Sequence, residues 1–290
     1  MQLPLAGYYI NLERSPDRAA FMEEQFARLG LGGMQRHDAV DGSRIPVPAG
    51  CRLLPAEYAC MLSHLQVLER AGAGQCILVL EDDAELSPQL PQLLASAVQG
   101  QLLANVDIVF LECQPHMTLP HLSALWNAAA AWLVDDAAGR RVTGVELLDA
   151  RSIFKWGTVA YVVTAAGREK LLSLMRGWLR EGPVLPVDRC CERSLQSGEL
   201  RGAITVPFLA TPGLQWHGKS TIGNGWRLPD DASMVLRRLL FAGSLDGVEA
   251  MAARMQQVPA DPALRMFGAV LREIADDQRQ QVVEARKARR

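Results

Sequence analysis

The stretch CILVLEDD, residues 76–83, decides the fold. Its first five residues form a continuous apolar run, which is typical of a central strand in a parallel sheet because both faces of such a strand are buried. The run stops at three consecutive carboxylates. In open α/β sheets, ligands bind beyond the carboxyl ends of the strands. The sequence therefore predicts Glu81, Asp82 and Asp83 at the rim of a ligand crevice.

Apolar runs and amphipathic stretches alternate on both sides of this strand. The apolar runs predict further buried strands at residues 7–12, 106–111, 158–163 and 203–207. Capping signals or an apolar face indicate helices that start at Ser15-Pro16, Pro55, Ser87-Pro88 and Thr164. This order implies a Rossmann-like α/β fold with helices on both faces of a mostly parallel sheet.

The 290 residues suit one large domain with a smaller appendage. We expect a catalytic domain at 1–229 and a helical C-terminal extension at 230–290, because the signals after residue 230 are only helical. Residues 211–229, rich in glycine, tryptophan and polar side chains, predict a functional loop. Within 113–151 the pattern is weak and indicates only one helix, near 126–134.

Composition excludes several classes of protein. The chain is 49% hydrophobic and 21% charged, which allows a substantial core. A net charge of −2 argues against general nucleic-acid binding. We expect no signal peptide and no membrane span, and the six cysteines, none in a CxxC pair, predict reduced thiols in a cytoplasmic protein. The basic end at 284–290 suggests peripheral contact with the inner face of a membrane, with a solvated terminus as the alternative.

The three adjacent carboxylates repel each other unless a cation neutralises them. Mg²⁺ and Mn²⁺ prefer oxygen ligands and commonly bridge to substrate phosphates. Glu81, Asp82 and Asp83 are therefore candidates for a metal–diphosphate site. The alternative is a solvated acidic turn.

A second constellation is NLERSPDR, residues 11–18. It joins a predicted strand to a helix N-terminus, which is a natural place for an anion. Arg14 and Arg18 are candidates to reach a diphosphate or a base edge. A well-capped helix with surface arginines is the alternative.

Single residues elsewhere add candidates. Asp188 and Asp107 are possible general bases, although Asp107 is better explained by hydrogen bonds to backbone amides. In the predicted loop, His217 is a candidate to complete a metal shell and Lys219 to meet a phosphate. His64 lies on the apolar face of a predicted helix and is read as a core histidine.

Taken in order, these segments resemble glycosyltransferase family 25, the group of lipooligosaccharide and collagen galactosyltransferases. The resemblance covers residues 7–223. It rests on YYINLERSPDRAAFMEEQFARLGL with HDAVDG (8–42), ACMLSHLQVLERA (59–71), ILVLEDDAEL (77–86), DIVFLE (107–112), GTVAYVVTAAGREKLL (157–172), PVD (186–188), Gln215 and Ser220-Thr221-Ile222.

The resemblance implies a GT-A fold, a UDP-sugar donor, dependence on Mn²⁺ and inversion at the anomeric carbon. It implies that Glu81, Asp82 and Asp83 hold the metal and the ribose. By the same resemblance, the nucleotide pocket would be lined by Asn11, Arg14 and Arg18. The chain departs from the family pattern at Glu57-Tyr58-Ala59-Cys60, at Glu112 and over 113–151.

The resulting hypothesis is a single in-line displacement on a UDP-sugar. A divalent ion, Mn²⁺ or Mg²⁺, is held by Asp83 with Asp82 and His217. Lys219 or Arg14 adds positive charge at the diphosphate, and Asp188 takes the proton from the acceptor hydroxyl. The resemblance favours galactose as the sugar and a lipooligosaccharide or other surface glycan or glycolipid as the acceptor. A peptide or protein acceptor is the alternative.

Two other classes compete with this hypothesis. A phosphorylated receiver domain shares the local pattern, but its phosphoacceptor position would hold Glu112 instead of aspartate. A non-catalytic family-25-like protein, acting in binding or assembly, is the second rival. The C-terminal helices suggest a homo-oligomer or a surface that binds a partner.

Overall fold

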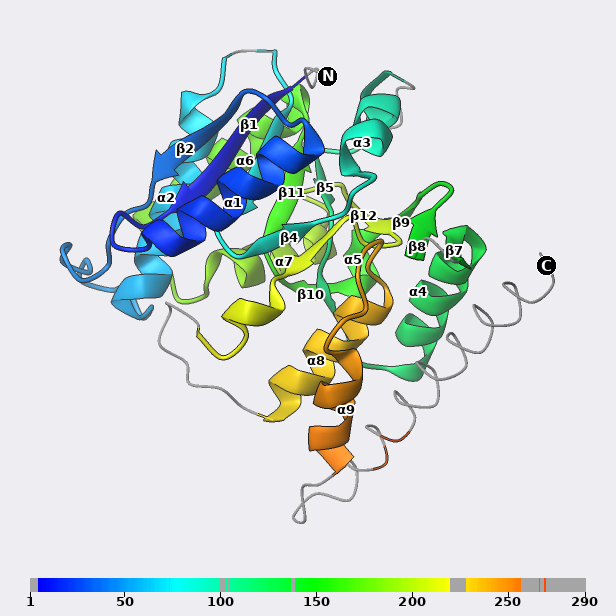
Figure 1. Cartoon of the computed structure of the whole chain (residues 1–290). Coiled ribbons are helices and arrows are strands. Elements are labelled where there is room, and N and C mark those ends of the chain that lie inside the picture. The colour runs from blue at the N-terminus through cyan, green and yellow to red at the C-terminus, as the bar shows by residue number, and fades with distance from the viewer. Residues whose placement is uncertain are drawn as a thin grey trace, which may run out of the picture.

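A seven-stranded sheet forms the centre of the computed structural model (Figure 1). The structure describes residues 5–72, 74–99, 103, 105–136, 139–219, 228–256, 266 and 269. The strand order is β2-β1-β3-β11-β5-β12-β9. The bounds are β1 (Ala6–Asn11), β2 (Met34–Asp38), β3 (Ile77–Glu81), β5 (Ile108–Phe110), β9 (Glu146–Asp149), β11 (Ala160–Val163) and β12 (Gly202–Val206).

The pairings confirm a mostly parallel α/β sheet. Strands β2, β1 and β3 pair in parallel, and β12 is parallel to β5. Strand β11 lies between β3 and β5 and is antiparallel to both, so β3 and β5 still point the same way. The edge strand β9 is antiparallel to β12. The carboxyl ends of five of the seven strands therefore share one edge.

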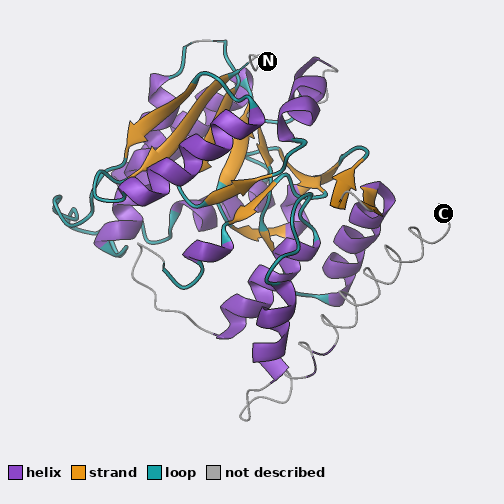
Figure 2. Ribbon diagram, in the orientation of Figure 1, coloured by secondary structure: helices purple, strands orange, loops and turns teal. Residues whose placement is uncertain are grey.

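Helices cover both faces of the sheet (Figure 2). Alternate residues of β3 point to opposite faces, and all four residues from Ile77 to Leu80 are fully buried. On one face, Ile77 and Val79 pack with helices α2 (Pro55–Arg70), α6 (Ala165–Glu181) and α7 (Val187–Ser197). On the other face lie α1 (Pro16–Leu29) and α3 (Leu90–Gln99). Double coverage explains why the sequence of β3 is a continuous apolar run.

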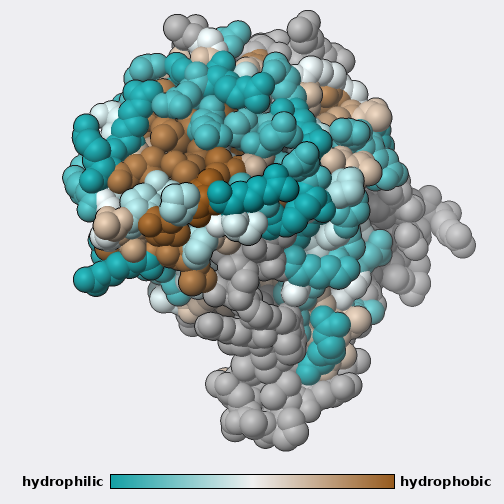
Figure 3. Space-filling model, turned by 90° about the vertical axis from the view of Figure 1, so that its left-hand side faces the viewer, coloured by the Kyte–Doolittle hydropathy of each residue, from teal (hydrophilic) through white to brown (hydrophobic). Residues whose placement is uncertain are grey.

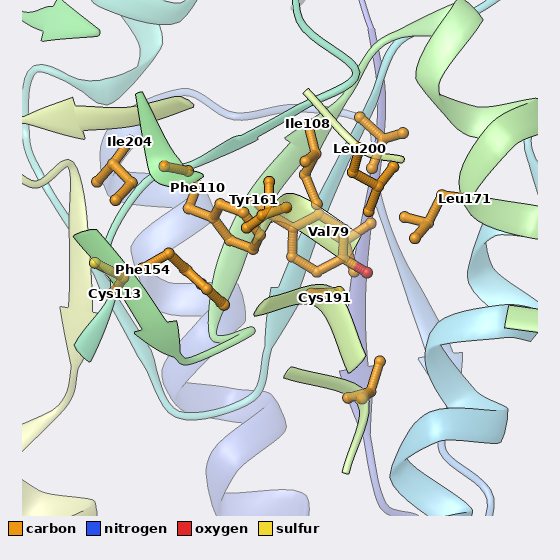
Figure 4. Close-up of a cluster of buried hydrophobic side chains, with 14 of the residues drawn as sticks. Val79, Ile108, Phe110, Cys113, Phe154, Tyr161, Leu171, Cys191, Leu200 and Ile204 are labelled. Carbon is orange, nitrogen blue, oxygen red and sulfur yellow. The ribbon is translucent and has the colours of Figure 1, made fainter. Parts of the chain in front are cut away.

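Aromatic side chains fill the first of these two cores, shown in Figure 4. The ring of Phe110, from β5, lies 4.1 Å from that of Phe154 and 6.3 Å from that of Tyr161, centroid to centroid. Val79 of β3 and Ile108 of β5 belong to the same cluster. The backbone pairing of β11 with β3 holds these two strands side by side, which sets the position of the acidic residues that follow β3.

The predicted helix starts at Ser15 and Thr164 are confirmed. Helix α1 begins at Pro16 and ends at Gly30, whose positive φ of 65° suits glycine. Thr164 accepts a hydrogen bond from the Gly167 amide, whereas the Ser15 side chain makes no capping bond. The helix predicted from Ser87 begins slightly later, at Leu90, and the Ser87 hydroxyl donates to the Ala242 carbonyl and accepts from the Gln89 amide.

Residues 113–151 hold more structure than the sequence predicted. Helix α4 (Leu119–Trp132) starts before the predicted 126, and β7 (Leu133–Asp136) forms a hairpin with β8 (Gly139–Val142). Strand β9 was missed because it is a half-exposed edge strand without a continuous apolar run. The remaining short elements are β4 (Ala84–Leu86), β6 (Gln114–Pro115), α5 (Ala150–Ile153), β10 (Phe154–Trp156), β13 (Ala210–Pro212) and the 3₁₀ helix η1 (Leu214–Trp216).

The predicted C-terminal helices appear as α8 (Leu228–Leu239) and α9 (Val248–Gln256). Helix α8 is tied to the sheet region by buried charges. Arg238, 1% exposed, pairs with Glu85 of β4, and Arg237 pairs with fully buried Glu112. Helix α9 packs on α8. The division into 1–229 and 230–290 stays a prediction, and the basic end at 284–290 lies outside the described residues.

Among the described residues, none of the helices combines the length and the apolar character needed to cross a membrane.

Candidate active site

The three predicted carboxylates lie at the carboxyl edge of the sheet, as the sequence indicated. Glu81 is the last residue of β3, and Asp82 and Asp83 form the turn into β4. Strand β4 pairs with β13, and the Gly213 amide donates to the Asp83 carbonyl oxygen at 2.7 Å. The predicted loop therefore begins directly beside the acidic turn.

Asp82 is held by the second predicted segment. Its carboxylate accepts hydrogen bonds from the Asn11 amide nitrogen and from the Arg18 guanidinium, each at 2.8 Å. Burial raises the pKa of Asp82, and the bonds from Arg18 and Asn11 oppose that rise. The two sequence motifs thus form one structural unit.

Arg18 is the buried centre of this unit. It is 6% exposed, donates to the Lys219 carbonyl at 2.9 Å and lies over the Trp216 ring at 5.0 Å. One side chain therefore connects helix α1, the acidic turn and the predicted loop at 213–219. Because both terminal guanidinium nitrogens of Arg18 donate to groups of the protein, this side chain supports the acidic turn directly. Its predicted role in nucleotide binding stays a prediction.

Asp83 has an unsatisfied carboxylate oxygen. Its Oδ2 lies 3.6 Å from Arg18, but its buried Oδ1 has no hydrogen-bond partner among the described residues. Burial raises the pKa of Asp83 to about 7, and the charge of Glu81 adds to this effect. A buried oxygen without a donor, beside two further carboxylates, fits a hard divalent cation such as Mn²⁺ or Mg²⁺.

Glu81 faces helix α2 instead of Asp83. Its Oε1 accepts a hydrogen bond from the Thr158 hydroxyl at 2.7 Å and lies 3.5 Å from His64 Nε2. Burial alone would raise the pKa of Glu81, but the interactions with His64 and Thr158 outweigh it and the pKa is lowered. Glu81 is therefore ionised more readily than its neighbour Asp83.

An open pocket of about 560 Å³ adjoins Glu81 and Asp82, between α2 and the ends of β1 and β2. Figure 3 shows the molecule from the side of β2 and α2, where apolar residues gather among hydrophilic ones. The lining includes Ile10, Leu12, Arg14, Ala39, Val40, Gly42, Ala56, Ala59, Cys60, Ser63 and His64. Apolar walls with a few polar groups are typical of small-molecule sites.

Arg14 is a lining residue of this pocket, and it forms an ion pair with Asp41. Hydrogen bonds from Ser43, together with Arg14, lower the pKa of Asp41 to about 2. Half of the Arg14 side chain is exposed. Arg14 is thus positioned by Asp41 while its guanidinium remains accessible to an anion.

The two candidate bases lie in different settings. Asp188 is in the first turn of α7, where its carboxylate accepts from the Arg189 amide at 2.7 Å. Burial raises its pKa, and the charge of Glu81 adds to the rise, so Asp188 lies in the field of the acidic site. Asp107 precedes β5 at the opposite edge of the sheet and accepts from the Arg201 amide at 2.8 Å. The structural role predicted for Asp107 is confirmed.

In the predicted loop, His217 and Lys219 have protein contacts. His217 Nε2 lies 2.6 Å from a carboxylate oxygen of Asp231, which is fully buried at the start of α8. Lys219 Nζ lies 5.8 Å from the Trp216 ring. Residues 220–227, including the matched Ser220-Thr221-Ile222, lie outside the described residues.

Several site residues were not predicted. Thr158 lies in the matched stretch 157–172 but was not singled out, and Asp231 lies outside the matched stretches; their contacts with Glu81 and His217 join distant parts of the chain. Arg237 of α8 was not predicted either, although its charge lowers the pKa of both Glu81 and Asp83. Helix α7 could have been predicted from the sequence, because apolar residues recur at helical spacing at Val187, Cys190, Cys191 and Leu195.

Replacing Arg18 by methionine should lower the free energy of unfolding by about 3 kcal/mol, because it leaves Asp82 buried without its main counter-ion. Urea denaturation measures this loss. Arg28→Met is the matched control, since Arg28 is an exposed residue in the last turn of the same helix. Equal stability of the two variants would contradict a supporting role for Arg18.

Comparisons with known proteins identify the family of the chain. A family model described as glycosyltransferase family 25 (LPS biosynthesis protein) matches residues 5–191. A protein of Anopheles gambiae named "Glycosyltransferase 25 family member" is 27% identical over 204 residues, which is 62% of this chain and 30% of that protein. A protein of the same name from Drosophila pseudoobscura pseudoobscura is 28% identical over 189 residues, which is 57% of this chain and 26% of that protein. The chain therefore matches less than a third of the length of these relatives.

Among solved structures, apo mouse xyloside xylosyltransferase 1 is similar to this chain with a TM-score of 0.34 and 12% sequence identity. The match covers 69% of this chain and 74% of that one. This similarity is too distant to inform the site. The family model, in contrast, covers the acidic turn, the segment at residues 11–18 and Asp188, and it extends over more than half of the chain. The chain belongs to glycosyltransferase family 25.

Proposed function

We propose that this chain transfers a hexose, with galactose as the first candidate, from a UDP-sugar to a hydroxyl of a surface glycan such as lipooligosaccharide, with inversion at the anomeric carbon. The observation that supports this most directly is the acidic turn at the carboxyl end of β3. There Asp83 Oδ1, which has no hydrogen-bond partner in the described part of the chain, lies in the same turn as Asp82, which lines the 560 Å³ pocket. A metal–diphosphate centre beside a nucleoside pocket needs this combination.

We infer that the acidic turn holds a divalent ion, Mn²⁺ or Mg²⁺, although the ligand atoms of Asp82, Asp83 and His217 do not converge into one group in the described part of the chain. Asp83 and Asp82 supply oxygen ligands, and the Asp231 contact on His217 Nε2 leaves Nδ1 as the ring nitrogen for a metal. A carboxylate on the second nitrogen is the usual arrangement of a metal-bound histidine. When bound, the ion would neutralise charge that develops on the departing diphosphate. The GT-A assignment and the metal requirement are part of this proposal.

The donor and the acceptor lie on different sides of the acidic turn in this proposal. The nucleoside occupies the pocket beside Glu81, with Arg14 and Lys219 offering positive charge to the diphosphate. Asp188 accepts the proton of the attacking hydroxyl. A single displacement needs one base and no protein nucleophile, and the raised pKa of Asp188 strengthens it as a base.

A UDP-release assay over a panel of UDP-sugars, with and without Mn²⁺, tests the proposal. Slow metal-dependent hydrolysis of one donor would identify the sugar without knowledge of the acceptor. If no donor turns over, calorimetry with UDP and Mn²⁺ shows whether the chain binds the nucleotide. Absence of UDP binding would reject the donor site and leave a non-catalytic binding or assembly role, whereas binding without turnover directs the search to glycan, peptide or protein acceptors.

Arg14→Ala should weaken UDP binding about tenfold, which corresponds to one charge-assisted hydrogen bond of roughly 1.5 kcal/mol. Arg44→Ala is a close control, because Arg44 also approaches Asp41, at 3.7 Å, but does not line the pocket. Calorimetric titration with UDP gives both affinities. If both variants bind UDP like wild type, the nucleotide lies elsewhere.

A further inference from the structure

A second group of potential metal ligands lies beside the acidic turn. Cys60 and His64 are one helical turn apart on α2, and Glu81 faces them from the end of β3. Their ligand atoms, one sulfur, one ring nitrogen and one carboxylate oxygen, all lie within 4.8 Å of one another. His64 is 1% exposed, and its Nε2 has no hydrogen-bond partner among the described residues.

The separations suit a bound metal. His64 Nε2 and Glu81 Oε1 lie 3.5 Å apart. Two tetrahedral ligands at about 2.0–2.2 Å from one zinc ion would be separated by roughly 3.4 Å. A thiol, an imidazole and a carboxylate together favour Zn²⁺ over Mg²⁺ or Mn²⁺, because thiolates select soft metals whereas Mg²⁺ and Mn²⁺ prefer oxygen ligands.

The surrounding residues already orient these ligands. The Tyr161 hydroxyl lies 2.8 Å from His64 Nδ1, which leaves Nε2 to face Cys60 and Glu81. The Thr158 hydroxyl donates to Glu81 Oε1 at 2.7 Å. Outer contacts of this kind are typical of metal-bound histidines and carboxylates.

An ion can reach this group from solvent. Cys60, His64 and Glu81 all line the open pocket described above. Three protein ligands would leave a fourth position for water or for a ligand in the pocket, as in catalytic and exchangeable zinc sites.

We propose that Cys60, His64 and Glu81 form a three-ligand Zn²⁺ site whose fourth position opens into the pocket. It is distinct from the site proposed at Asp83, Asp82 and His217, because it shares none of those residues and includes a thiolate. The proposal does not rest on the UDP-sugar reaction. The competing explanation is a structural contact between His64 and Glu81 without a metal.

Substitution with Co²⁺ gives a direct test, because a thiolate–Co²⁺ bond produces a charge-transfer absorption in the near ultraviolet. We expect this band in the wild-type chain at one equivalent of Co²⁺. It should disappear in Cys60→Ser and persist in Cys51→Ser, a half-buried cysteine outside the group. It should also persist in Asp83→Asn, which separates this site from the acidic one. No band in the wild type, or a band that survives in Cys60→Ser, overturns the proposal.

Zinc affinity provides the second measurement. In competition with a chromophoric chelator, His64→Gln should bind Zn²⁺ at least about 100-fold more weakly than wild type, since it loses a ligand and not only an outer contact. If the α2 variants fail to fold, an alkylation assay on the wild-type protein alone tests the site. Stoichiometric Zn²⁺ should slow alkylation of Cys60 relative to Cys51, as read by peptide mass spectrometry. Equal alkylation of Cys60 with and without Zn²⁺ would refute the site.

Discussion

Replacing Asp83 by asparagine is expected to reduce metal-dependent UDP release by about 10³-fold or more, because the variant removes the charged oxygen that most needs a cation. The turn itself should stay intact, since the bond from the Gly213 amide goes to the Asp83 backbone carbonyl. Asp38→Asn is the control, as Asp38 is an 81% exposed carboxylate at the end of β2. Rates of UDP release with saturating Mn²⁺ provide the measurement.

The same variant has a second expected effect, on stability without metal. The pKa of Asp83 is raised by burial to about 7 from 3.8. Ionisation therefore favours the unfolded chain, and stability falls as the pH rises from the ordinary carboxyl pKa through about 7. Asp83→Asn should remove this loss and raise the metal-free Tm above that of wild type at alkaline pH. A full loss of activity together with a lowered Tm at every pH would indicate misfolding instead of a lost metal ligand.

The position of the acidic turn was predictable because it depends on one local rule. A continuous apolar run predicts a doubly covered strand, and side chains that follow such a strand reach the ligand edge. Arg18 was predicted by a different rule, because residues 11–18 join a strand to a helix N-terminus, and Asn11 was implied only by the family resemblance. Only the partners were unknown, and Arg18 turned out to be bonded to Asp82.

The rest of the site depends on contacts between distant parts of the chain. His217 was a recognisable candidate, but its partner Asp231 lies on α8, and nothing local marks it. Arg237 likewise reaches Glu112 from 125 residues away along the sequence. His64 was correctly predicted to be buried, but its approach to Glu81 requires α2 to pack on β3. Sequence periodicity gives the faces of elements, and only the packed fold gives these pairs.

Asp188→Asn should lower kcat by roughly 10³-fold while leaving UDP affinity unchanged, because it removes the base without removing a donor contact. The first turn of α7 should persist, since the asparagine side chain also accepts a hydrogen bond at a helix N-terminus. Glu199→Gln, an exposed carboxylate just after α7, is the control. Calorimetry with UDP and steady-state kinetics separate binding from catalysis.

Both Asp188 and Asp83 have raised pKa values, so either carboxyl would produce an acid limb in the pH profile of kcat/KM. The response of this limb to the Mn²⁺ concentration distinguishes the two residues. A base works only when ionised, so activity should fall as the pH drops through the raised pKa of Asp188. Protonation of a metal ligand competes with the metal, so a limb caused by Asp83 moves to lower pH as Mn²⁺ is increased. A limb caused by Asp188 stays in place at all Mn²⁺ concentrations. A limb that moves with Mn²⁺ and survives in Asp188→Asn would exclude Asp188 as the base.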